Sequence, residues 1–132
     1  MNGFSVRVAA QCNSSCRALE EAARGLVEEG IEAPAQTLGH VAQSLERLSQ
    51  EAAAEPDTLS YDQVGAVTHD GFRAVRQVVS QVRTLAAAGS GREVGAFLRI
   101  AIRLEKVART LRALNVDSFQ ETQPIHPRKP NR

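Results

Sequence analysis

The sequence contains no tryptophan and has few aromatic residues of any kind. Only 4% of its residues are aromatic although 42% are hydrophobic, so alanine, leucine and valine supply most of the apolar side chains. This composition is typical of packed helices rather than of a sheet, in which aromatic residues are enriched. The chain has 132 residues, which is enough to bury one core without stabilisation by disulfides or a structural metal. We therefore predict a single helical domain.

Cysteine and long hydrophobic runs are also scarce. The two cysteines, Cys12 and Cys16, are too few for a disulfide framework. Arg7 interrupts the N-terminal segment FSVRVAA, so we expect no secretory signal. The most apolar late stretch, VGAFLRIAIRL, contains Arg99 and Arg103 and is therefore not expected to span a membrane. These absences favour a cytoplasmic protein with no membrane partner.

Hydrophobic residues recur at alternating spacings of three and four in four segments of the chain, which predicts four amphipathic helices. Gly30, Pro56 and the GSG turn at 89–91 separate these segments. The first and fourth predicted helices cover residues 5–29 and 92–115. The second opens with Pro34 near its first turn and is stopped by Pro56, and the third begins at the Ser60 cap and runs towards the GSG turn. Because their connections are short, we predict an all-α fold, an antiparallel up-down four-helix bundle over residues 1–116.

The start of the third helix carries the clearest local signal. Ser60 and Gln63 match a capping box, and Leu59 with Val64 matches a hydrophobic staple. The last segment, residues 117–132, loses the helical periodicity and contains three prolines. We predict a disordered C-terminal tail there. Its PIHPRK motif matches a polyproline ligand, although a plain solvated tail is the favoured interpretation.

The cysteines invite a metal or redox interpretation because they stand four residues apart. Both continue the hydrophobic seam that also carries Leu19 and Leu26, so we expect them to pack in the core. A structural zinc site needs four ligands. His40 and His69 fall outside the seams of their helices and are predicted to face water. A metal or redox protein using the Cys pair is thus a remote alternative, and we expect no metal and no cofactor.

Catalytic motifs are not recognisable in the sequence. A ferritin-like di-iron site needs Glu-x-x-His pairs, but threonine stands at position 37 and alanine at position 66. The histidines also lack the Lys and Gly that follow the active histidine of phosphotransfer domains. A glycine-rich phosphate loop would follow a strand, and no strand is predicted. We therefore expect a protein that is not an enzyme.

Charge is unevenly distributed along the chain, although the formal net charge is only +1. Residues 1–58 contain nine acidic and four basic side chains, whereas residues 59–116 contain nine basic and four acidic ones. The predicted basic interaction face consists of Arg73, Arg76, Arg83, Arg92, Arg99, Arg103 and Lys106. The predicted acidic interaction face consists of Glu20, Glu21, Glu28 and Glu29. The bundle is thus expected to combine an acidic and a basic hairpin.

Three hypotheses follow from this charge pattern. The two hairpins attract one another within the monomer while their outer faces remain solvated. Alternatively, the charged faces dock onto a protein partner or onto a second copy, as in an adaptor or accessory subunit. In the third hypothesis the basic face follows the phosphate backbone of RNA or DNA. The near absence of aromatic residues for base stacking weakens the third hypothesis. We predict a non-catalytic interaction or assembly module.

Overall fold

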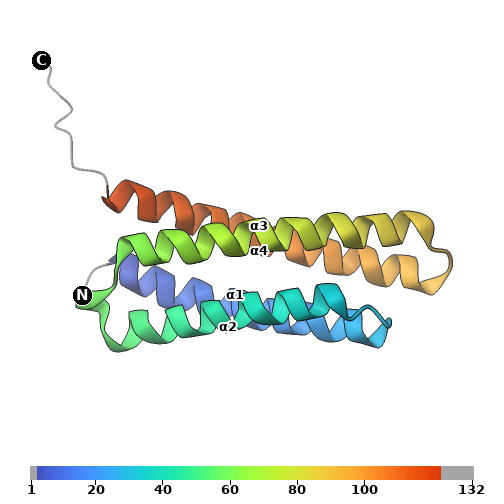
Figure 1. Cartoon of the computed structure of the whole chain (residues 1–132), viewed down its shortest axis with the longest axis horizontal. Coiled ribbons are helices and arrows are strands. Elements are labelled where there is room, and N and C mark those ends of the chain that lie inside the picture. The colour runs from blue at the N-terminus through green and yellow to red at the C-terminus, as the bar shows by residue number, and fades with distance from the viewer. Residues whose placement is uncertain (1–2, 123–132) are drawn as a thin grey trace, which may run out of the picture.

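A computed structural model of the chain describes residues 3–122 and contains no strand within them (Figure 1). The helices are α1 (Gly3–Glu28), α2 (Ala33–Ala54), α3 (Tyr61–Ala88) and α4 (Arg92–Thr122), with a short 3-10 helix η1 (Pro56–Thr58) between α2 and α3. The predicted all-α four-helix bundle is confirmed. None of the described helices is both long and apolar enough to cross a membrane.

The four helices pack as neighbours in chain order. In Figure 1 each helix runs back beside the one before it, and α1 also lies against α4. The helices α3 and α4 have 28 and 31 residues, compared with 26 and 22 for α1 and α2. The turn between α3 and α4 accordingly extends beyond the turn between α1 and α2 (Figure 1).

Local signals in the sequence explain the helix boundaries. Gly30 and Gly91 have φ angles of 81° and 78°, a left-handed conformation that glycine adopts without steric cost. The Ser60 hydroxyl accepts a hydrogen bond from the Gln63 backbone N–H at 3.1 Å, as the predicted cap requires. The Gln63 side chain instead donates to Glu51 Oε1 at 3.0 Å and so joins α3 to α2.

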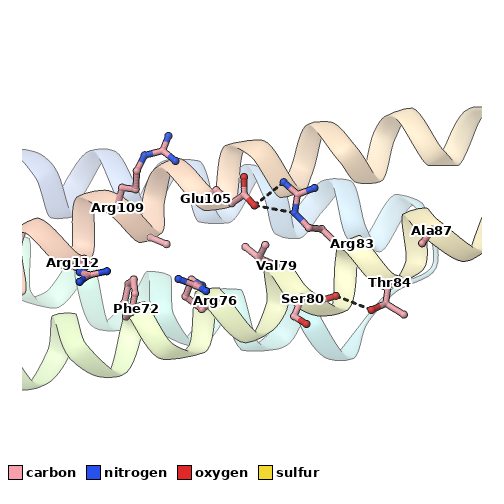
Figure 2. A pocket seen from close by; sticks show the side chains of 11 residues that line it. Phe72, Arg76, Val79, Ser80, Arg83, Thr84, Ala87, Glu105, Arg109 and Arg112 are labelled. Carbon is pink, nitrogen blue, oxygen red and sulfur yellow. Dashed lines mark hydrogen bonds and ion pairs between the residues drawn. The ribbon is translucent and has the colours of Figure 1, made fainter.

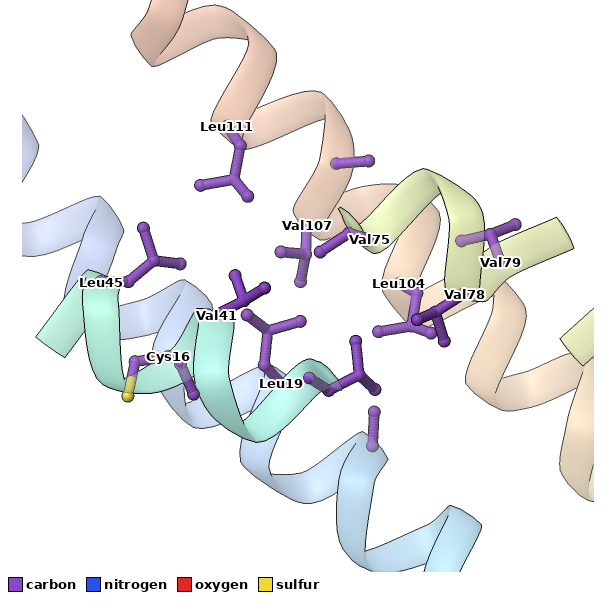
Figure 3. Close-up of a cluster of buried hydrophobic side chains, with 14 of the residues drawn as sticks. Cys16, Leu19, Val41, Leu45, Val75, Val78, Val79, Leu104, Val107 and Leu111 are labelled. Carbon is purple, nitrogen blue, oxygen red and sulfur yellow. The ribbon is translucent and has the colours of Figure 1, made fainter. Parts of the chain in front are cut away.

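One continuous core runs through the bundle, and the predicted seams supply it (Figure 3). Leu19, Leu45, Leu104 and Leu111 are completely buried, and each contributes on the order of 1.5–3 kcal/mol through removal of its side chain from water. Seam residues near the helix ends are only partly buried: Ala9, Ala23, Leu85 and Val94. The two cysteines lie in the core, as predicted.

The C-terminal boundary differs from the prediction. Helix α4 continues past the expected end at Asn115 and through residue 117, where the tail was predicted to begin, as far as Thr122. Asn115 Nδ2 donates to the Gly65 carbonyl at 2.8 Å, and the Ser118 hydroxyl donates to the Asn115 carbonyl at 2.8 Å. Because polar residues make these contacts, the buried hydrophobic seam, which ends at Leu114, does not reveal the extension. The PIHPRK motif lies outside the described residues.

Candidate functional site

The two thiols are buried and protonated at neutral pH. Burial raises the pKa of Cys12 to about 12, and the neighbouring Cys16 adds to this effect. Burial also raises the pKa of Cys16 to about 11, with further contributions from the Glu20 and Glu46 carboxylates. Thiolates are the nucleophilic and metal-binding form of cysteine, so both side chains are poorly suited to chemistry. Their environment instead suits apolar packing.

Cys16 nevertheless lies near two carboxylates, from Glu20 on its own helix and Glu46 on α2. The possible ligand atoms of these three residues lie within 4.8 Å of one another, and both glutamates are exposed. His40 and His69 are exposed, as predicted, and neither belongs to this group. The four-ligand site of two cysteines and two histidines is therefore not assembled within residues 3–122.

The groove between α3 and α4 has a volume of about 680 Å³ and is rich in arginine (Figure 2). Arg83 of α3 donates two hydrogen bonds to Glu105 Oε2 of α4, at 2.9 and 2.6 Å, across the groove. Close packing shows the register of the two helices, since a Cβ atom at Gly71 would lie 3.2 Å from Leu111 and one at Gly65 would lie 3.0 Å from Ser118. In this register Phe72 and Arg76 lie beside the segment of α4 that contains Glu105 and Arg109 (Figure 2). The side chains that line the groove are those of Phe72, Arg76, Val79, Ser80, Arg83, Thr84, Ala87, Glu105, Ala108, Arg109 and Arg112.

Most of the positive charge in this groove is not neutralised. Arg83 is paired with Glu105, whereas no carboxylate of the described residues lies within ion-pair distance of Arg76, Arg109 or Arg112. The Arg76 guanidinium lies 5.7 Å from the centroid of the Phe72 ring, which holds it by a cation–π contact. The groove thus presents three guanidinium groups to an incoming ligand.

A second groove, of about 530 Å³, lies between α1 and α4. Arg99, Arg103 and Lys106 line it from α4, and Glu21 lines it from α1. Arg103 is paired with Glu21 at 3.0 Å between Nη1 and Oε1. Arg109 lines both grooves, so the basic surface continues across the outside of α4.

The structure therefore distributes the predicted basic residues over more than one surface. Arg76 and Arg83 share the α3–α4 groove, whereas Arg99, Arg103 and Lys106 share the α1–α4 groove. Arg73 and Arg92 are exposed and line neither groove. Sequence reasoning missed Arg109 and Arg112, which continue from Glu105 at spacings of four and three. The spacing of Arg109 and Arg112 is visible in the sequence, but the sequence does not show that α3 lies beside them.

The predicted acidic residues are also separated. Glu20 lies beside Cys16, and Glu21 faces α4. Glu28 lies with Arg24 and Glu32 near the turn between α1 and α2, and Glu29 follows the last residue of α1. Their role in binding stays a prediction. Comparisons of the chain with protein-family models, curated proteins and solved structures give no match.

Proposed function

We propose that the protein is a non-catalytic interaction module that binds an acidic protein partner in the groove between α3 and α4. The observation that carries this proposal is the set of three guanidinium groups, from Arg76, Arg109 and Arg112, that have no carboxylate within ion-pair distance in the described chain. Arginine forks bind carboxylates with two parallel hydrogen bonds, and uncompensated charge of one sign steers an oppositely charged partner into contact.

The walls of the groove favour a protein ligand over a simple counterion. Val79 and Ala108 provide an apolar floor, while the exposed hydroxyl groups of Ser80 and Thr84 stand beside it. A helix that carries both carboxylates and small apolar side chains would match this mixture of surfaces.

The test is binding of a fluorescent helical peptide that alternates glutamate with alanine and leucine. We expect Arg76→Glu and Arg112→Glu each to weaken binding by about tenfold or more, because each variant places a carboxylate opposite the peptide's own carboxylates. Arg47→Glu makes the same charge change at an exposed site on α2 and should bind like the wild type. Equal losses in all three variants would show that only net charge matters, and unchanged binding in the groove variants would refute the proposal.

Binding to a nucleic-acid backbone is the second candidate, and the continuity of the basic surface through Arg109 favours it. A phosphate backbone crossing α4 would meet Arg76 and Arg112 on one side and Arg99 and Lys106 on the other. Titration of mixed-sequence RNA and DNA against salt tests this candidate, because release of counterions produces a steep negative salt dependence. Absence of binding at about 50 mM salt would exclude it.

A further inference from the structure

Exposed hydrophobic residues are concentrated on the outside of α4. Large apolar side chains that remain well exposed on α4 are Leu98 (40%), Ile102 (62%), Val116 (44%) and Phe119 (62%). Elsewhere in the described residues only Val6 and Val27, both on α1, are comparably exposed. Burial of the α4 residues in an interface would remove this apolar surface from water.

These four residues belong to a second regular stripe on α4, separate from the buried seam. We define the outer stripe as Leu98, Ile102, Glu105, Arg109, Arg112, Val116 and Phe119. Its members follow one another at spacings of four, three, four, three, four and three. At about 100° per residue they fall within roughly 100° of arc, so one neighbouring helix is able to contact all of them.

The residues of the outer stripe lie at nearly equal distances on either side of Arg109, at 4, 7 and 11 residues before it and at 3, 7 and 10 residues after it. Apolar pairs lie at its two ends, and Glu105 and Arg112 lie on opposite sides of the centre. An antiparallel pairing centred on Arg109 therefore brings together residues of one copy and of the other as follows: Leu98 with Phe119, Ile102 with Val116, and Glu105 with Arg112. A two-fold axis repeats each of these contacts, as an isologous interface requires.

We propose that two copies of the protein associate about a two-fold axis through the outer stripe, with their α4 helices antiparallel. The order of the charged residues along the outer stripe favours an antiparallel second copy, because it places the one acidic residue, Glu105, opposite an arginine. In the antiparallel arrangement Glu105 meets an arginine and only Arg109 meets its own equivalent. A parallel arrangement would place Glu105, Arg109 and Arg112 each opposite the same residue of the second copy, which is repulsive.

The contacts within one copy leave the required atoms accessible. Both hydrogen bonds from Arg83 end on Glu105 Oε2, and Oε1 has no hydrogen-bond partner among the described residues. Glu105 Oε1 thus binds Arg112 of the second copy while the Arg83 pair remains intact. The contact extends over about 32 Å of helix, from residue 98 to residue 119, at the usual rise per residue. A single helix pair is a small interface, so we expect dissociation constants between about 10 µM and 1 mM.

The first test is sedimentation equilibrium of the full chain over a concentration series up to about 1 mM. We expect a monomer–dimer equilibrium that Ile102→Glu abolishes, because a carboxylate would replace an apolar contact on both sides of the axis. Val27→Glu is the matched control, since Val27 is 52% exposed but lies on α1. A wild type that stays monomeric throughout would overturn the proposal, as would equal loss of dimer in both variants.

Charge reversal tests the register and direction of the pair. Glu105→Arg and Arg112→Glu should each weaken the dimer by about tenfold, whereas the double variant restores the pair with its charges exchanged. Arg109→Ala should strengthen association because it removes the like-charge contact at the axis. Circular dichroism confirms that each variant remains folded. Failure of the double variant to recover would overturn the antiparallel register.

Oxidative cross-linking gives an independent test in a Cys12→Ala, Cys16→Ala background. An Arg109→Cys variant should form a disulfide-linked dimer, because position 109 meets its equivalent at the axis. An Ile102→Cys variant should not, since its two equivalents lie about 21 Å apart along the helices. Cross-linking at position 102 but not at position 109 would refute this arrangement. Arg76 lies outside the outer stripe but lines the same groove as Arg109 and Arg112, so the dimer and the acidic peptide are expected to compete. Arg76→Ala removes a guanidinium without adding a carboxylate beside Glu105, and it should weaken peptide binding while leaving the dimer intact; this separates the dimer from the proposed acidic partner.

Discussion

The hairpin of α1 and α2 and the hairpin of α3 and α4 bury similar residues but present different surfaces to solvent. Both contribute small and branched aliphatic side chains to the same core. Outside the core, residues 1–58 carry mainly acidic groups and residues 59–116 mainly basic ones. Among the residues that the structure describes, the α3–α4 groove contains three guanidinium groups without an ion-pair partner, and the α1–α4 groove contains two, those of Arg99 and Arg109. The shared core explains stability, whereas the charged outer surfaces distinguish the two hairpins.

The largest expected effect tests whether the two hairpins form one cooperative unit. Leu19 on α1 and Leu104 on α4 are both completely buried. We expect Leu19→Ala and Leu104→Ala each to lower the free energy of unfolding by about 2–5 kcal/mol, through lost burial and the cavity that remains. Urea unfolding followed by circular dichroism measures this loss. A second transition confined to one hairpin would show that the hairpins are energetically independent.

A smaller loss of stability is expected from a substitution at Gly71, where the two hairpins meet. A Cβ atom at Gly71 would lie 3.2 Å from Leu111 Cδ1 and 3.3 Å from Val41 Cγ1, on α4 and α2. We therefore expect Gly71→Leu to destabilise the bundle by about 1–3 kcal/mol through overpacking. Gly39→Leu is the control, because a Cβ atom at Gly39 meets nothing within 4 Å. Equal unfolding midpoints for the two variants would contradict close packing at Gly71.

The cysteines should make the acidic hairpin sensitive to alkaline pH. Their pKa values in the folded chain, about 12 for Cys12 and about 11 for Cys16, exceed the ordinary value of 9.0. The unfolded chain therefore loses protons at lower pH than the folded chain does. This contribution to stability is present below pH 9 and declines as pH rises from about 9 towards 12. We expect the midpoint temperature of thermal unfolding to fall less between pH 9 and pH 12 in the Cys12→Ala, Cys16→Ala variant than in the wild type. An equal fall in both proteins would show that the buried thiols are not the source of the pH dependence.

The smallest expected effect concerns attraction between the hairpins. Arg103 and Glu21 form an ion pair across α4 and α1, but both side chains are about half exposed. Exposed ion pairs contribute only about 0.2–1 kcal/mol, so Arg103→Ala should change stability by no more than this. A double-mutant cycle with Glu21→Ala measures the coupling directly. A coupling well above this range would show that charge attraction contributes substantially to holding the hairpins together.

Much of the fold was predictable because the core repeats in a regular way along the chain. Seam residues such as Leu38, Val75 and Leu111 are buried as their spacing predicts, and Ser60 caps α3. The end of α4 was not predictable from periodicity, because Asn115 and Ser118 hold it through hydrogen bonds. A polar side chain has no periodic signature that distinguishes a buried contact from an exposed one.

The candidate site was predicted less completely than the core. The excess of arginine in the second half of the chain was evident, but Arg109 and Arg112 were not selected. Which arginines face the same groove depends on the register between α3 and α4, and close packing such as that of Gly71 against Leu111 sets that register. A pattern along one helix does not reveal which residues of another helix lie beside it.

The sequence by itself determined the class of fold, the residues that fill the core and the opposite charges of the two halves. Local spacing is sufficient for these properties because an amphipathic helix must bury its apolar stripe. Only the tertiary structure decided how the charges are grouped. Packing of α4 between α1 and α3 divides its basic residues between two grooves, and it leaves the outer stripe exposed. Those groupings depend on contacts between segments far apart in the chain, which local periodicity does not encode.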